Sequence, residues 1–226
     1  MGQKISPYTL RLGINEGWYS RWFFPKNSAV YLEADCSIRN IIAELFPKSG
    51  IGEVIIERKS PDTCRVIVKT AKPGFLIGRE GQNLRKLQER LDKSLTKLFE
   101  KFKLTKPTTE FQIEEIKKPF TSARVLAQFA AAEIEKRISV RRVMKGIIEK
   151  GRQNKEIGGI KIRLSGRLNG AEIHRTEALS FGKLTLGTLK SKIDYAAEIA
   201  KCTYGIVGIK VWLYKGESTG REDVTA

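Results

Sequence analysis

A strand pattern, a short bridge, a Gly-x-x-Gly sequence and an amphipathic helix pattern follow one another without a break over residues 66–98. The glycines are Gly78 and Gly81. The helix pattern after them carries a leucine stripe on one face: Leu84, Leu87, Leu91, Leu95 and Leu98. Because glycine has no side chain between its backbone and a ligand, a sugar-phosphate chain can lie directly against the main-chain amides at the helix N-terminus. This order of elements therefore predicts a loop that binds a single nucleic-acid strand.

Two glycines three residues apart occur often by chance in a chain with 20 glycines, so the glycine pair alone is weak evidence. The strand before it and the helix after it make the pattern specific. The leucine stripe belongs to a core under any interpretation, so only the loop is predicted to carry function. We therefore predict RNA contacts at Gly78, Arg79 and Gly81. Glu80 lies in the same loop, and an acid that faces a phosphate chain should weaken this contact.

The charge of the chain indicates a polyanionic partner. Its 42 Lys and Arg residues against 25 Asp and Glu residues give a formal net charge of +17. This excess is larger than solubility alone requires. Residues 136–167 form the most basic stretch, with eleven basic and two acidic side chains. We expect this stretch to be the main electrostatic contact with nucleic acid.

Several function classes are disfavoured by what the sequence lacks. No run of about 18 apolar residues occurs, and the N-terminus has no hydrophobic segment of the signal-peptide type. Cys36, Cys64 and Cys202 are scattered without a Cys-x-x-Cys pair, so we expect three buried thiols in a reducing compartment. The sequence therefore predicts a soluble protein with no membrane association, metal, cofactor or small-molecule substrate.

Residues 1–28 show no sustained periodicity and are predicted to form an N-terminal extension. They combine basic side chains, Lys4 and Arg11 among them, with a cluster of aromatic residues: Trp18, Tyr19, Trp22, Phe23 and Phe24. Such a segment can become ordered on a partner, with one or two rings stacking on bases. Alternatively, the rings fill the core of the domain that follows, which is the favoured interpretation for most of them.

Residues 29–118 are predicted to form one domain. Apolar spacing over residues 34–46 indicates a helix, and strand patterns at 53–59 and 64–70 are joined by turn residues. A third strand is predicted at 110–116, after the Gly-x-x-Gly sequence and its helix. The order of helix, two strands, short helix, Gly-x-x-Gly, helix and strand resembles a type II KH domain. This resemblance implies an RNA-binding fold with a three-stranded sheet and helices on one of its faces.

Residues 119–216 are predicted to form a second domain, followed by a flexible polar tail at 217–226. Apolar residues at helical spacing from 126 to 138, and again from 140 to 150, indicate two helices. Strand patterns follow at 160–165, 171–177 and 207–214. We therefore expect an α+β protein whose second domain packs two helices on a mostly antiparallel sheet.

The second helix of this domain has an apolar side and a basic side. The apolar side holds Val140, Val143, Met144 and Ile147. The basic side holds Arg141, Arg142, Lys145 and Arg152. A charged helix face is usually only solvated, but here Glu149 alone dilutes four bases, so nucleic-acid contact is favoured. In the strand that follows, Lys161 and Arg163 point outward and make one face of the sheet basic.

An enzyme acting on nucleic acid would need parts that this chain does not offer. The one Gly-Lys pair is Gly182-Lys183, and Glu177 stands where a phosphate-binding loop would need glycine, which excludes an NTP-driven helicase. Acids that could hold magnesium do not cluster, and His174 has no obvious catalytic partner. We predict no catalytic residue and no metal ligand. The open alternatives are a nuclease or lyase with a lysine nucleophile, and a free KH-domain RNA chaperone or ribosome assembly factor.

Several segments resemble one family: residues 1–5, 11–14, 165–173, 175–177, 192–195 and 203–212. This is the family of the bacterial-type third protein of the small ribosomal subunit, and the resemblance runs from residue 1 to about residue 217. It implies a structural constituent of the subunit head that binds small-subunit ribosomal RNA and lines the channel where messenger RNA enters. It also implies that Arg141, Arg142 and Lys145 assist passive unwinding of messenger RNA, and that the tenth and fourteenth proteins of the subunit are neighbours.

Further ribosomal RNA contacts are assigned to Lys4, Arg11, Arg152, Lys161, Arg163 and Arg167. The sequence departs from the family in three places. Arg79-Glu80 stands where bacterial members usually have two lysines, and Ser6 stands where many have histidine. Residues 178–190 keep only part of the pattern, so we expect a rearranged loop near His174. The family implies a place on ribosomes of the bacterial cytoplasm, or of an organelle with bacterial-type ribosomes.

Overall fold

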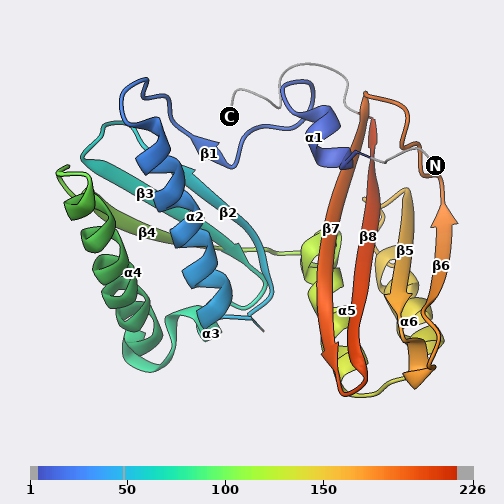
Figure 1. The fold of residues 1–226 in the computed structure, drawn as a ribbon. Coiled ribbons are helices and arrows are strands. Elements are labelled where there is room, and N and C mark those ends of the chain that lie inside the picture. The colour runs from blue at the N-terminus through green and yellow to red at the C-terminus, as the bar shows by residue number, and fades with distance from the viewer. Residues whose placement is uncertain (1–4, 48, 218–226) are drawn as a thin grey trace. The chain divides into compact units, whose positions relative to one another are not determined.

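The computed structural model describes residues 5–47 and 49–217, and these residues form two compact units (Figure 1). One unit is made of residues 19–117. The other combines the residues up to Trp18 with those from Lys118 onward. Each unit contains helices packed on a sheet, so the predicted α+β class is confirmed. Lys4 and the predicted tail after residue 217 lie outside the described residues.

The unit of residues 19–117 has the predicted order of elements, which confirms the KH fold. Its helices are α2 (Ser28–Leu45), α3 (Pro73–Ile77) and α4 (Gln82–Lys101), with a short 3-10 turn η1 (Arg79–Gly81) between the last two. Its main strands are β2 (Ile51–Glu57), β3 (Thr63–Thr70) and β4 (Thr108–Glu115). Strand β3 pairs antiparallel with β2 and parallel with β4. Helices α2 and α4 lie on one face of this sheet (Figure 1).

The core of this unit follows the periodicity of the sequence. Leu87, Leu91 and Leu95 of the leucine stripe are each about 1–2% exposed. They pack with apolar residues of α2 and of the strands, including Ile38 and Val66. Full burial of such a side chain stabilises a fold by about 1.5–3 kcal/mol, so the stripe is a large part of what holds α4 to the sheet.

The aromatic cluster of residues 18–24 divides into buried and exposed rings. Trp22 and Phe24 pack on Tyr31 of α2, with ring centroids 5.7 and 5.3 Å away. In contrast, the Trp18 and Phe23 side chains are 65% and 87% exposed. Strand β1 (Ser20–Arg21) directly precedes Trp22 and pairs parallel with β2, which extends the predicted three-stranded sheet to four strands. Part of the predicted extension therefore belongs to the KH unit.

The buried carboxylate of Asp35 joins α2 to β1 and to the residue that follows β2. The Asp35 carboxylate lies 2.8 Å from Nη2 of Arg58, and both side chains are almost fully buried. Its other oxygen accepts hydrogen bonds from Ser20 Oγ and Trp22 Nε1, each at 2.9 Å. Because removing one partner of a buried pair costs about 3–5 kcal/mol, this network fixes the path of residues 20–22 on the KH core.

The second unit packs two helices on one antiparallel sheet, as predicted. The helices are α5 (Ala123–Glu135) and α6 (Val140–Arg152), preceded by a short turn η2 (Pro119–Thr121). The strands are β5 (Gly159–Gly166), β6 (Arg175–Gly182), β7 (Ser191–Cys202) and β8 (Gly205–Glu217), with a turn η3 (Leu168–Gly170) after β5. The strand order is β6-β5-β8-β7, and every pair is antiparallel. Helices α5 and α6 lie on the same face of the sheet, which we call the inner face (Figure 1).

Side chains from the sheet and its loops cap the starts of both helices. The Ala123 N–H at the start of α5 donates to Asp194 Oδ2 of β7 at 2.9 Å. The Val140 N–H at the start of α6 donates to Asn169 Oδ1 of η3 at 3.1 Å. Glu198 of β7 also lies under α5, where burial raises the pKa of its carboxyl and the positive charge of Arg124 opposes the rise. These polar contacts fix the helix ends to the sheet.

The first described residues belong to this second unit, and they show that one RNA assignment is wrong. Arg11 ends the short helix α1 (Pro7–Arg11), and its side chain is fully buried. Its guanidinium donates to the carbonyl oxygens of Ser191, Leu186, Thr188 and Pro7 at 2.7–3.0 Å. Burial lowers the pKa of Arg11, and Glu16 opposes this. Arg11 therefore fastens the N-terminal segment to the start of β7 and has no surface to offer to RNA.

Replacing Arg11 by lysine should destabilise this attachment. An ammonium group cannot reproduce the planar set of donors that reaches four carbonyl groups, and each buried group left unpaired costs about 1–3 kcal/mol. We expect the β7 amides to exchange with solvent about thirtyfold faster in Arg11→Lys, equivalent to about 2 kcal/mol. Hydrogen exchange of the full chain measures this directly. Arg163→Lys, at an exposed position, should leave the exchange unchanged, and equal exchange in both variants would contradict the role of Arg11.

Candidate nucleic-acid interface

The Gly-x-x-Gly loop joins α3 to α4 through three residues with positive φ. Gly78 has φ 73°, Glu80 has φ 52° and Gly81 has φ 75°. A Cβ at Gly78 would lie 2.8 Å from the side chain of Asn83 in α4, so glycine is required there for space as well as for conformation. Asn83 Nδ2 donates to the Phe75 carbonyl oxygen at 2.9 Å, which holds the loop against the start of α4.

This loop leaves the start of α4 open to a ligand. Gly81 is the N-cap residue of the helix and supplies no side-chain capping bond. The Gln82 N–H donates to the Arg79 carbonyl oxygen, but no side chain caps the start of α4, so the positive end of the helix dipole is available to an anion such as a phosphate group. Arg79 and Glu80 are both exposed beside this helix start, and Phe75 and Ile77 form an apolar rim with 52% and 40% exposure. The loop combines backbone donors, one cation and apolar side chains, as a single RNA strand requires.

Helix α6 separates its apolar and basic residues as predicted. Its inward residues are each at most 4% exposed: Val140, Val143, Met144 and Ile147. Arg141, Arg142 and Lys145 are exposed. Lys145 follows Arg141 by four positions and Arg142 by three, and at these spacings side chains are neighbours on a helix surface, with Cβ atoms about 5–6 Å apart. These three residues, which we call the basic comb, can therefore contact neighbouring phosphates of one strand.

The surroundings of the comb define its extent. Arg141 forms an ion pair with Glu177 of β6 at 3.5 Å, but the arginine side chain is 80% exposed, so the pair is weak. Lys150 turns back onto the Phe129 ring of α5, with Nζ 3.2 Å from the ring centroid. Arg152 is exposed and lies over the Phe181 ring at 5.1 Å, about 16 Å along the helix axis from Arg141. Arg152 is therefore a separate surface cation.

The outer face of the second sheet, opposite α5 and α6, carries the predicted strand cations. Lys161 and Arg163 of β5 alternate with buried residues, and Arg163 is exposed. Trp212 and Lys210 of β8 lie directly across from Lys161 and Arg163 in the strand register. The sequence analysis did not single out Lys210, although the alternation of residues 207–214 already placed it on the outer face.

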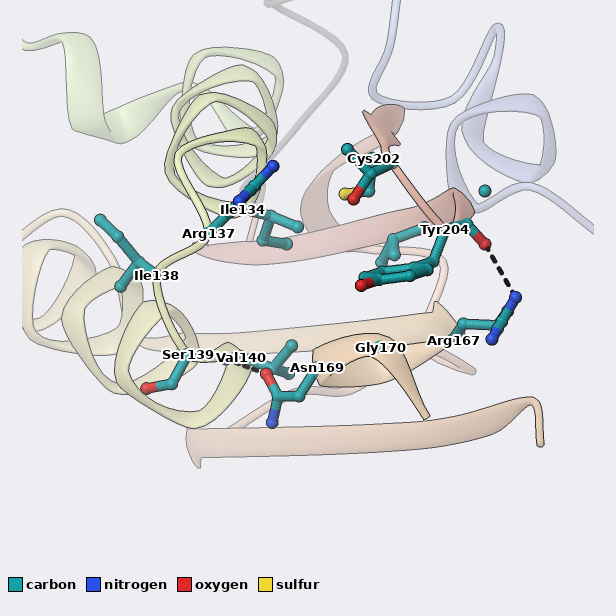
Figure 2. A pocket seen from close by; sticks show the side chains of 13 residues that line it. Ile134, Arg137, Ile138, Ser139, Val140, Arg167, Asn169, Gly170, Cys202 and Tyr204 are labelled. Carbon is teal, nitrogen blue, oxygen red and sulfur yellow. Dashed lines mark hydrogen bonds between the residues drawn. The ribbon is translucent and has the colours of Figure 1, made fainter. Parts of the chain in front are cut away.

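Arg167 has a structural role in the loop between β5 and β6. Its Nε donates to the Ala171 carbonyl oxygen at 2.9 Å, and its Nη1 lies 3.4 Å from the Tyr204 carbonyl oxygen. Its guanidinium also lies 5.6 Å from the centroid of the Tyr204 ring. Arg167 thus joins this loop to the β7–β8 hairpin, as Figure 2 shows, while its side chain stays exposed and able to contact a phosphate.

A cavity of about 530 Å³ lies beside these contacts, between the α5–α6 connection and the β7–β8 hairpin (Figure 2). The Tyr204 ring, Asn169 and residues 137–140 contribute to its lining. Arg137 has φ 63°, an uncommon conformation for a residue other than glycine. Arg137 therefore places a further cation beside the cavity, close to the start of α6. Arg137 was not among the residues predicted from the sequence to bind RNA.

The described residues contain no group of three or more His, Cys, Asp and Glu side chains placed to hold a metal ion. Within the same ranges, no helix is long and apolar enough to cross a membrane. His174 is exposed. Cys64 is buried, which raises the pKa of its thiol to about 11, whereas Cys36 is exposed, so the prediction of three buried cysteines is wrong.

Comparison with protein families gives matches in both units. The model for the KH domain matches residues 37–120. The model for the C-terminal domain of ribosomal protein S3 matches residues 130–213. The second match contains α6 and most of the sheet, and the first contains the Gly-x-x-Gly loop. Both candidate RNA-binding surfaces therefore lie in segments that other proteins share.

Similar proteins named small ribosomal subunit protein uS3 cover almost the whole chain. The protein of Kosmotoga olearia is 42% identical over 217 residues, which is 96% of this chain and 96% of the relative. That of Thermosipho africanus is 42% identical over 218 residues, covering 96% and 99%. That of Maridesulfovibrio salexigens is 40% identical over 222 residues, covering 98% and 99%.

The Gly81→Asp variant tests the Gly-x-x-Gly loop. A Cβ at Gly81 meets no atom within 4 Å, and aspartate and asparagine tolerate positive φ better than other residues, so the fold should be retained. A carboxylate at this position would face phosphate, and we expect the affinity of the full chain for single-stranded RNA to fall about tenfold, as about 1.4 kcal/mol of lost binding implies. Gly81→Asn has the same shape without the charge and should lose less. If both variants fold and bind like the native chain, the loop does not contact RNA.

Proposed function

We propose that this chain, which belongs to the family of small ribosomal subunit protein uS3, binds small-subunit ribosomal RNA and lines the channel where messenger RNA enters. Members of this family are structural components of the small subunit, so the chain is not an enzyme. The net charge of +17 supports this proposal, since a surface with this charge attracts a polyanion. The observation that carries it is the basic comb of α6, whose cations are exposed and rigidly held by a buried apolar side.

Ribosomal RNA contact is assigned to the Gly-x-x-Gly loop and to separate cations of the second unit. The loop offers the N-terminus of α4, which no side chain caps, together with Arg79. The second unit offers Arg152, Lys161, Arg163 and Arg167, whose backbones are held in α6, β5 and the turn after β5. Contacts to phosphates from several rigid elements position an RNA fold without reading its sequence.

Messenger RNA contact is assigned to Arg141, Arg142 and Lys145. Three cations on one helix face can hold the phosphates of one strand of a duplex, while the other strand has no such contact with the comb. The comb does not consume a nucleotide. The movement of messenger RNA through the ribosome supplies the work, and the comb lowers the free energy of the separated strand relative to the duplex. Unwinding on this account is passive.

The proposed surroundings follow from the same assignment. The tenth and fourteenth proteins of the small subunit are the expected protein neighbours. The protein is expected on ribosomes in the bacterial cytoplasm, or in an organelle with bacterial-type ribosomes. Chemical crosslinking of assembled small subunits tests the neighbours directly.

Replacing the three comb residues by alanine should impair translation of structured messages only. Alanine favours helix, and no buried contact is lost, so folding and subunit assembly should be retained. Ribosomes that carry Arg141→Ala, Arg142→Ala and Lys145→Ala together should slow several-fold on a message with a stable duplex ahead of the decoding site. They should translate a matched message without the duplex at the native rate. Paired reporters measure both rates.

A charge-conserving variant is the matched control. Arg141→Lys with Arg142→Lys keeps three cations on the same helix face, and lysine also binds phosphate, so both reporters should stay close to the native rate. Equal slowing of both reporters by the alanine variant would mean that the comb supports assembly or general RNA binding. The unwinding role would then be withdrawn.

A further inference from the structure

The outer face of the second sheet is an organised surface that the proposed contacts use only in part. Its side chains fall into rows across the order β6-β5-β8-β7. The first row is Ser180, Lys161, Trp212 and Tyr195. The second row is Ala178, Arg163, Lys210 and Ala197. The third row is Thr176, Ser165, Gly208 and Ile199.

These rows form one surface with aromatic rings at one end. Helices α5 and α6 lie on the opposite face of the sheet, and α1 is held at the Ser191 end of β7 by Arg11 (Figure 1). Apart from the cations and Ile199, the second and third rows hold only small side chains, so they leave the cations accessible to a ligand. Successive rows lie about 6.7 Å apart along the strands. An extended chain that runs parallel to the strands can therefore meet one row after another.

Trp212 and Tyr195 form an aromatic pair in the first row. Their ring centroids are 5.4 Å apart with an interplanar angle of 39°, and neither residue is fully buried. Lys161 Nζ lies 5.9 Å from the Trp212 ring centroid. Aromatic rings on a sheet, with a cation beside them, are the arrangement on which unpaired bases stack.

The charges of these rows are all positive. Lys161, Arg163 and Lys210 are accompanied by no acidic residue within the three rows. Arg163 and Lys210 lie directly across from each other on adjacent strands, where like charges destabilise a sheet. Both are exposed, and neither forms an ion pair with any described residue. A polyanion laid over the second row would relieve this repulsion.

We propose that this outer face binds an unpaired segment of ribosomal RNA, with bases stacked on Trp212 and Tyr195 and phosphates held by Lys161, Arg163 and Lys210. The inference rests on the proposed function of ribosomal RNA binding and names the form of RNA and the residues that select it. A duplex hides the faces of its bases, so it could use the cations but not the rings. An acidic protein segment could likewise pair with the cations but would leave the aromatic pair without a stacking partner.

Tryptophan fluorescence of the full chain tests the proposal at the site itself. The probes are oligouridylate and an abasic oligomer of the same length, which keeps the phosphates and lacks the bases. Oligouridylate should quench the part of the emission that comes from Trp212, and this part should be absent in Trp212→Phe. The abasic oligomer should bind without this quench, because a sugar-phosphate chain cannot stack.

Two sets of variants separate stacking from charge. Trp212→Thr with Tyr195→Thr keeps residues that favour strands, and it should weaken binding of oligouridylate about tenfold without changing binding of the abasic oligomer. Lys161→Gln with Arg163→Gln and Lys210→Gln should weaken binding of both oligomers. Circular dichroism confirms that each variant folds.

Three results would overturn the proposal for the outer face without contradicting the proposed function of the chain. One is the absence of a Trp212-dependent quench with oligouridylate while Gly81→Asp still lowers RNA affinity. Another is an equal loss for both oligomers in the threonine variant. A third is crosslinking of Lys161 and Lys210 to a neighbouring protein in the assembled subunit. If the native chain binds neither oligomer at all, ribosomal RNA binding itself is contradicted.

Discussion

The burial of one side of α6 against the inner face of the second sheet determines what this unit can offer to RNA. Val143, Met144 and Ile147 are at most 4% exposed, and burying each stabilises the fold by about 1.5–3 kcal/mol. With that side of the helix fixed, Arg141 and Arg142 must lie outside, close together and on a rigid backbone. Their charges gain no compensation from the core, so they are available to phosphate.

In the KH unit, the backbone at the start of a helix, and not a row of cationic side chains, is what can face a phosphate group. The positive φ of Gly78 and Gly81 turns the chain sharply into α4, and the side chain of Asn83 fills the space that a larger residue at position 78 would need. The first residues of α4 then carry no side-chain cap, so the positive end of the helix dipole is available to an anion there. Glu80 stands beside them and opposes an anion, so this loop should bind RNA more weakly than a loop with two cations.

Elements with a clean period could be predicted from the sequence, and elements whose order depends on distant contacts could not. Helix α6 and strand β5 follow their periods closely, whereas β7 directs Asp194 and Glu198 toward the helices and was missed. From the sequence alone, Arg11 cannot be distinguished from a surface cation. Its partners are carbonyl groups 175–180 residues away, apart from that of Pro7 in its own helix, and only the folded chain brings them together. The contact of Arg167 with the β7–β8 hairpin could not be predicted for the same reason, because only folding brings Arg167 close to the Tyr204 carbonyl oxygen.

We propose that contacts with ribosomal RNA hold this protein in the small ribosomal subunit as a fixed component. The most direct test is the amount of the chain that stays with purified small subunits after a high-salt wash. Exposed phosphate contacts weaken steeply with salt, but a protein built into the folded RNA should stay at one copy per subunit. Loss of most of the chain from otherwise intact subunits would contradict the account and would indicate a free RNA chaperone or assembly factor.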